Sequence, residues 1–139
     1  MNTQDMASQA LSVDVPASEW VTANGRYHWA DRARRVRALR FRGLILSRRA
    51  DLRPVSGRVR VVAHVVTRTR TRMDPANAAP TVKALIDGAL VDARVVPDDD
   101  DVHLVGPDFR RGPVCGDLDK GFHRITITIT DFEDSYNEV

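Results

Sequence analysis

The chain has a single cysteine, Cys115, and no apolar run long enough to cross a membrane. One cysteine excludes an internal disulfide and is typical of proteins of the reducing cytoplasm. A spanning helix needs an apolar stretch of about 18 residues or more. The sequence also shows no charged-then-apolar leader resembling a signal peptide. We therefore expect a cytoplasmic protein with no membrane partner.

Several patterns that carry chemistry are also missing. Cys115 has no accompanying Cys or His arrangement suited to zinc or to a thiol nucleophile. Neither a phosphate-binding glycine loop nor a G-x-S-x-G element occurs. The aspartate run at 98–101 lacks the glycine and glutamate positions of an EF-hand loop. These absences leave the distribution of charged residues as the main guide to function.

The length of 139 residues and the hydrophobic content of 42% suit one domain with one core. Domains commonly take about 100–200 residues, so a second domain is not expected. The first nine residues are mostly polar, and three of the last seven are acidic. We predict a disordered N-terminus over 1–9, a folded domain over 10–132 and an acidic tail over 133–139.

Lysine is scarce, because only Lys83 and Lys120 among the 21 basic residues are lysines. Nine of the arginines lie between residues 26 and 49. Arginine suits bidentate contacts with phosphate, although a high genomic GC content accounts for the excess equally well. The acidic residues gather elsewhere, at 98–101 and in the tail. Opposite charges are thus separated along the chain.

Hydrophobic periodicity predicts a small α+β domain. Helices are expected over 29–49 and 77–93, the second with apolar residues at i, i+3, i+4 and i+7. Strands are expected over 10–17, 58–71, 102–106 and 122–130. In the last strand Ile125, Ile127 and Ile129 alternate with threonines and face inward. These elements suggest a mixed, mainly antiparallel sheet of about four strands with two helices.

The strand over 58–71 leads into a basic run that ends in a carboxylate. If the strand's alternation continues, Arg68, Arg70, Arg72 and Asp74 share one face. A carboxylate in that position could meet a phosphate held by the arginines. The alternative interpretation is a solvated sheet edge whose charges discourage aggregation.

Two further groups of carboxylates follow. Lys83 and Asp87 stand four residues apart on the second helix, which by itself indicates an ordinary surface pair. Most runs such as 98–101 are solvated turns, and adjacent like charges need arginine, a metal or both nearby. Mg²⁺ is usually held by one or two carboxylates, with phosphate and water completing its shell. Arginines beside carboxylates therefore indicate phosphodiester chemistry on nucleic acid.

Taken in order, these residues resemble the RusA family of Holliday-junction resolvases, which is common on phages and prophages. The resemblance covers about residues 24–130. It rests on NGRYHW at 24–29, DPAN at 74–77, Lys83 with Asp87, and VVPDD at 95–99. Two departures stand out: Ala76 replaces a second aspartate, and about three extra residues, including Pro80, separate Asn77 from Lys83.

The resemblance implies a homodimeric, Mg²⁺-dependent endodeoxyribonuclease that acts on four-way junctions in DNA recombination and repair, with Mn²⁺ as an alternative metal. It implies that Asp74 and Asp99 hold the metal, with Asp98 in place of Asp99 if the register shifts by one. Lys83 would stabilise charge on the phosphate, and Asp87 would position Lys83 or the metal shell. The DNA contacts would come from Arg26, Arg68, Arg70, Arg72 and Asn77.

Two alternatives stay open at this point. Within nuclease chemistry, the substrate could be a flap or a fork instead of a junction. In another class, the protein could be a non-catalytic dimer that binds branched DNA, an interpretation that Ala76 keeps open because it removes one carboxylate.

Overall fold

The strands of the computed structural model form one sheet. The model describes residues 8–132, so the predictions for 1–7 and 133–139 lie outside the described residues. Its strands are β1 (Ser8–Pro16), β2 (Val59–Val66), β3 (Leu104–Arg111) and β4 (Phe122–Asp131), in the order β1-β4-β2-β3. Strand β4 runs antiparallel to β1 and to β2, whereas β2 and β3 are parallel. The predicted mixed, mainly antiparallel sheet is confirmed.

One face of the sheet supplies half of the core. Alternate residues of β2 and β4 are almost completely buried, and the threonines between the isoleucines of β4 are half-buried on the other face. The predicted alternation of Ile125, Ile127 and Ile129 is therefore confirmed. Because successive side chains of a strand point to opposite faces, all of these buried residues lie on one face of the sheet, and the helices pack on that face.

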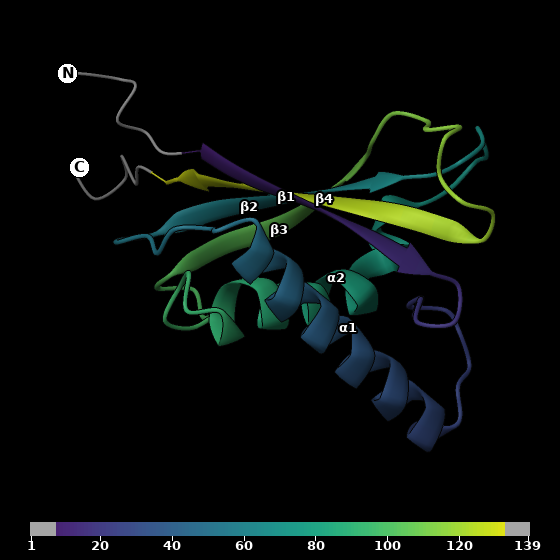
Figure 1. The fold of residues 1–139 in the computed structure, drawn as a ribbon, viewed down its shortest axis with the longest axis horizontal. Helices are drawn as coiled ribbons and strands as arrows, with labels where there is room; N and C mark the ends of the chain where they lie inside the picture. The colour runs from purple at the N-terminus through teal and green to yellow at the C-terminus, as the bar shows by residue number, and fades with distance from the viewer. Residues whose placement is uncertain (1–7, 133–139) are drawn as a thin grey trace.

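Both helical segments cover the same side of the sheet (Figure 1). Helix α1 (Trp29–Arg49) has the predicted bounds, and it buries Leu39, Gly43 and Ser47, which lie four residues apart on one stripe. The first turns of α1 project beyond the sheet in Figure 1.

The second helical segment consists of three consecutive helix types instead of the single helix predicted over 77–93. They are the 3₁₀ helix η2 (Pro75–Ala78), α2 (Ala79–Ile86) and the π-helix η3 (Asp87–Asp92). The segment starts at Pro75 because the Asp74 carboxylate accepts a hydrogen bond from Ala76 N at 3.1 Å. Pro80 lies in the first turn of α2, where its missing N–H is not needed. The apolar stripe of this segment is buried as predicted.

The two helical segments cross at glycines. A Cβ added to Gly88 would lie 1.8 Å from the carbonyl oxygen of Arg40, and one added to Gly43 would lie 2.6 Å from that of Leu85. At the same crossing the Ser47 hydroxyl donates a 2.7 Å hydrogen bond to the Ala89 carbonyl. That bond satisfies a carbonyl within the π-helix, so the unusual helix type is supported by packing against α1.

We expect Gly88→Ala to lower the free energy of unfolding by about 3 kcal/mol or more, because the new methyl group meets backbone that cannot rotate away. Urea denaturation measures the change. Gly116→Ala is the matched control, since a Cβ there has no neighbour within 4 Å, and it should alter stability by less than about 0.5 kcal/mol. Unfolding of both variants at the same urea concentration would contradict the proposed close crossing.

Several strand ends differ from the predictions. Strand β1 begins at Ser8, two residues before the predicted domain start. Strand β2 ends at Val66 instead of continuing to residue 71, because no apolar side chain follows until Met73 to hold the chain on the core. Strand β3 runs from Leu104 to Arg111 instead of 102–106. It is an edge strand with mostly half-exposed residues, so its sequence need not alternate.

The described residues contain no helix that combines the length and the apolar character needed to cross a bilayer.

Candidate active site

Lys83 lies on the exposed side of α2 between two carboxylates. Its Nζ donates to Asp87 Oδ1 at 3.1 Å and also to Asp99 Oδ2. Asp87 opens η3, and Asp99 lies in the turn region after Pro97, 16 residues beyond Lys83. The fold therefore brings the predicted helical pair and the aspartate run together. We call Lys83, Asp87 and Asp99 the lysine cluster.

The charges of the lysine cluster stabilise one another. The hydrogen bond from Lys83 is the main cause that lowers the pKa of Asp99, and the same bond, followed by that to Asp87, raises the pKa of Lys83. Asp98 lies beside the cluster, because its carboxylate accepts from Asp99 N at 2.7 Å. Two carboxylates thus contact one ammonium group, and a third is bonded to the backbone beside them, which leaves negative charge that suits a hard cation.

A second ion pair lies near the lysine cluster. Arg40 of α1 donates to both oxygens of Asp92 at 2.6 and 2.8 Å. Asp92 is the main cause that raises the pKa of Arg40, and the charges of Asp87 and Asp99 add to the effect. Helix α1 therefore meets the acidic side of η3 through a bidentate pair.

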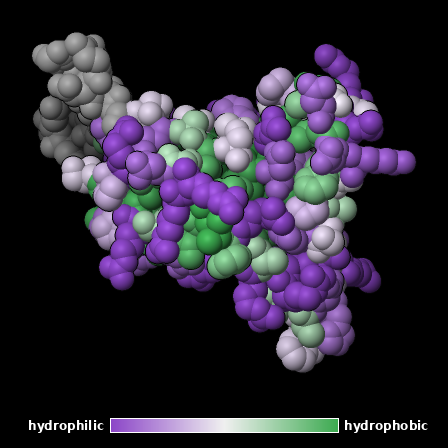
Figure 2. Space-filling model, in the orientation of Figure 1, coloured by the Kyte–Doolittle hydropathy of each residue, from purple (hydrophilic) through white to green (hydrophobic). Residues whose placement is uncertain are grey.

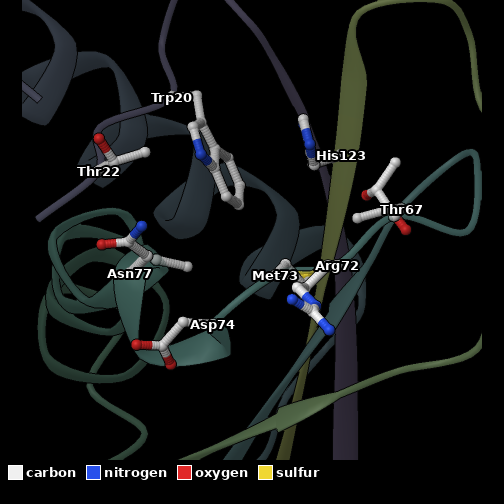
Figure 3. A pocket seen from close by; sticks show the side chains of 10 residues that line it. Trp20, Thr22, Thr67, Arg72, Met73, Asp74, Asn77 and His123 are labelled. Atoms are coloured by element: carbon white, nitrogen blue, oxygen red, sulfur yellow. The ribbon is translucent and has the colours of Figure 1, made fainter. Parts of the chain in front are cut away.

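Asp74 and Asn77 line a pocket with a volume of about 240 Å³. Figure 3 shows their side chains and those of Trp20, Arg72 and His123 around its open centre. The pocket was not predicted, because its walls come from the segment after β1, from the segment before η2 and from β4. The only sequence signal near it is the DPAN element itself.

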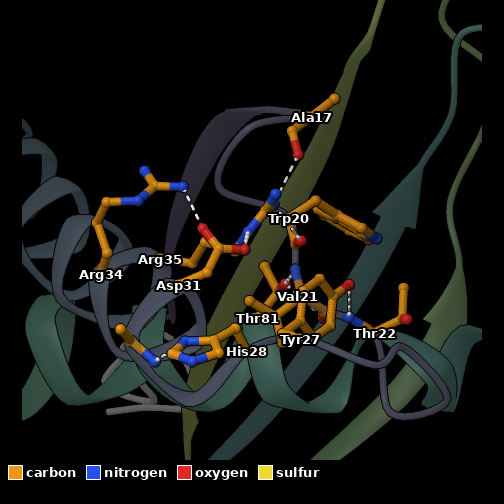
Figure 4. Close-up of polar contacts among 11 residues, drawn as sticks. Ala17, Trp20, Val21, Thr22, Tyr27, His28, Asp31, Arg34, Arg35 and Thr81 are labelled. Carbon is orange, nitrogen blue, oxygen red and sulfur yellow. Dashed lines mark hydrogen bonds and ion pairs between the residues drawn. The ribbon is translucent and has the colours of Figure 1, made fainter.

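The segment after β1 is tied directly to the wall of this pocket. Ala23 N donates to the Asn77 carbonyl at 2.9 Å. The buried Thr81 hydroxyl both accepts from Val21 N and donates to Val21 O, each at 2.8 Å (Figure 4). The stretches at 24–29 and 74–77, which together carry part of the family resemblance, are therefore held by neighbouring parts of one structure.

Side chains from α1 complete this support. Arg35 donates to the carbonyls of Ala17 and Trp20, both at 3.0 Å, and its guanidinium lies over the Tyr27 ring (Figure 4). Asp31 binds Arg35 and Arg34, and these bonds lower the pKa of Asp31. The backbone around Trp20 is therefore fixed by several contacts before any ligand arrives.

The arginine run does not continue a strand, so the prediction that Arg68, Arg70, Arg72 and Asp74 share a strand face is wrong. Residues 67–74 follow β2 as irregular chain. All three arginines are nevertheless exposed, as is Arg26. Arg68 Nε donates to Leu118 O at 3.2 Å. For Arg70 and Arg72, the described part of the chain shows no hydrogen bond or ion pair.

Arg111 of β3 holds this arginine run in place, a role that the sequence did not reveal. Its guanidinium binds the Thr67 hydroxyl at 2.8 Å and the carbonyls of Thr69 and Thr71. Arg111 thus anchors the backbone of this stretch, and the arginine side chains along it are exposed. In the view of Figure 2 most of the surface is hydrophilic, with apolar side chains showing only in small areas.

The predicted site residues fall into two groups. Asp74, Asn77 and Arg72 surround the pocket, whereas Lys83, Asp87 and Asp99 form the lysine cluster with Asp98 beside it. Within residues 8–132 no hydrogen bond joins the two groups, and no three His, Cys, Asp or Glu side chains are placed to hold a metal ion together. The donor set around Asp99 still fits Mg²⁺, which can be held by one or two carboxylates. Joint ligation by Asp74 and Asp99 stays a prediction.

Fold and site together define a small α+β domain with exposed arginines, a lysine cluster and a polar pocket. Comparison with known protein families and with curated proteins finds no match to this chain.

Proposed function

We propose that this protein is a Mg²⁺-dependent endodeoxyribonuclease that resolves four-way DNA junctions as a homodimer, acting in recombination and repair in the cytoplasm. The observation that carries the proposal is the lysine cluster, in which the fold gathers Lys83, Asp87 and Asp99 from two separate segments. Its exposed ammonium and acidic surroundings suit a phosphate and a divalent cation held against each other.

The proposed roles follow from position and charge. Asp99, with Asp98 beside it, and Asp74 would hold the ion, which when bound supplies a hydroxide nucleophile and neutralises phosphate charge. Lys83 has a side chain that is 59% exposed, so a phosphate can approach its ammonium group. Asp87 fixes the direction of Lys83 through the 3.1 Å bond. Arg26, Arg68, Arg70 and Arg72 are exposed for backbone contacts, and Asn77 and Arg72 both line the pocket.

The dimer follows from the substrate. Resolution of a four-way junction requires a cut in each of two symmetry-related strands. A two-fold dimer presents two identical sites related by the same symmetry. One lysine cluster in each protomer would then serve one strand.

The second candidate is a non-catalytic dimer that binds branched DNA. Two observations favour it: Ala76 offers no carboxylate, and residues 8–132 contain no preassembled group of three metal-binding side chains. Under this interpretation the arginines bind the junction and the acidic residues only shape the surface charge.

Incubation of the purified protein with a synthetic four-way junction tests both. We expect paired nicks near the crossover in Mg²⁺, none in EDTA, and no cleavage of a linear duplex of the same sequence. Binding without cleavage in either Mg²⁺ or Mn²⁺ would establish the binding dimer instead. Cleavage of flaps or forks but not junctions would identify the other nuclease substrate.

A further inference from the structure

The pocket beside Asp74 has an aromatic wall. The rings of Trp20 and His123 stack with centroids 4.7 Å apart and planes inclined by 22°. They come from distant parts of the chain, the segment after β1 and the first residues of β4. Both rings line the pocket of about 240 Å³ (Figure 3). Because the two rings stack on each other, each has only its outer face left for contact, and an aromatic face of this kind can hold a flat, π-rich ligand.

The rest of the wall is polar. Asn77 offers an amide that both donates and accepts, and Thr22 offers a hydroxyl. His123 Nδ1 is buried, and the described part of the structure provides no hydrogen-bond partner for it. Burial lowers the pKa of His123, so the ring is neutral near pH 7.

A cation lies at the opening. Arg72 lines the pocket and is exposed, and within residues 8–132 it has no carboxylate partner. Asp74, the candidate metal ligand, lines the same pocket. The ligand that matches these surroundings has an aromatic ring, hydrogen-bonding groups on its edge and a phosphate a short distance away.

We propose that this pocket binds one unpaired nucleobase, with its ring against the Trp20–His123 pair, its edge at Asn77 and its phosphate at Arg72. The inference deepens the proposed function and rests on it for the biological substrate. The pocket is smaller than the roughly 300 Å³ typical of drug-sized ligands, so it suits one base and excludes a base pair. A base at a branch point is cheaper to unpair than one within a duplex.

Base binding would act as a positioning device. A base held in the pocket fixes the sugar-phosphate chain attached to it, and Asp74 lies at the wall of the same pocket. The pocket therefore determines which phosphate comes next to the candidate metal ligand. It would also give cleavage a preference for the identity of one nucleotide.

The test uses Trp20 as its own reporter. The chain has two tryptophans, and the other, Trp29, is 77% exposed, so Trp29→Phe leaves Trp20 alone with little effect on the fold. This variant is titrated with a single-stranded octadeoxynucleotide containing all four bases and with an abasic octamer of the same charge. We expect the base-containing octamer to quench Trp20 emission and to bind about tenfold more tightly, since stacking on an aromatic side chain favours a base by roughly that factor or more.

Two histidine variants in the same background locate the effect. His123→Ala removes half of the aromatic wall and should bring the ratio of the two affinities close to one. His64→Ala is the matched control, because His64 is half-buried on β2 and does not line this pocket, and it should leave the ratio unchanged. Thermal melting of both variants confirms that they are folded.

Equal affinity and equal quenching for the two octamers would overturn the base pocket, as would failure of both to bind. The result is independent of nuclease activity, because neither octamer is a junction. If the protein prefers the base-containing octamer but never cuts junctions, the base pocket is supported and the proposed function is wrong. If the protein cuts junctions but shows no preference between the octamers, only the base pocket is wrong.

Discussion

Asp74→Asn and Asp99→Asn should each reduce junction cleavage by about a hundredfold or more, while junction binding stays unchanged or becomes tighter. Both substitutions keep the size of the side chain and remove the charge that would hold Mg²⁺. Binding improves if anything, because a negative charge near phosphate is lost. Single-turnover cleavage and gel-shift titration measure the two effects separately.

The structure makes these substitutions informative. Asparagine is as good an N-cap as aspartate, so Asp74→Asn keeps the hydrogen bond that starts η2. Asp101→Asn is the matched control, since Asp101 is exposed in the same aspartate run and has no assigned role. If both test variants cut at the parental rate, Asp74 and Asp99 are not metal ligands.

Lys83→Ala should lower the cleavage rate by about a hundredfold and change junction affinity by only a few fold. The ammonium group is proposed to act on charge that develops in the transition state, so its loss affects rate more than binding. The fold should survive, because water can solvate Asp87 and Asp99 once the largely exposed Lys83 is removed. Lys120→Ala, at the only other lysine, is the control and should behave as the parent does.

Arg70→Ala provides the contrasting outcome. Arg70 is exposed, so its substitution should weaken binding and reduce the log–log salt dependence by about 0.9 for one lost phosphate contact. Cleavage at saturating protein should be nearly unchanged. If Lys83→Ala shows the same pattern as Arg70→Ala, Lys83 is only another backbone contact.

The sequence predicted those elements in which the buried side chains recur with the period of a helix or a strand. Helix α1 shows its stripe through Leu39, Gly43 and Ser47, and β4 shows alternation of isoleucine and threonine. The alternation from Thr67 to Arg72 misled, because it contains two polar residue types and neither requires a sheet. Arg111 of another strand holds this stretch instead, through the Thr67 hydroxyl and the backbone carbonyls of Thr69 and Thr71.

In the candidate site, too, contacts set by local spacing are more predictable than contacts set by the tertiary fold. The lysine cluster could be anticipated only in part: helical spacing joins Lys83 to Asp87, but the run at 98–101 was expected to meet arginine or a metal, and Asp99 instead meets Lys83. The pocket could not, since Trp20 and His123 are brought together only by pairing of β1 with β4. Within the π-helix the Ala89 carbonyl accepts from the Ser47 hydroxyl of another helix, a contact that no local pattern reveals.

The glycine crossing has a mechanical consequence. Because the backbone of Gly88 lies against that of Arg40, α1 cannot slide or roll over η3 without the two segments separating. The bidentate pair between Arg40 and Asp92 spans the same junction. A force that acts on α1 would therefore pass to η3 and the lysine cluster without an intervening hinge. Under the proposed function this part of the protein would be a stiff template, and the bending needed for a fit would fall on the nucleic acid, where flexible base steps cost least.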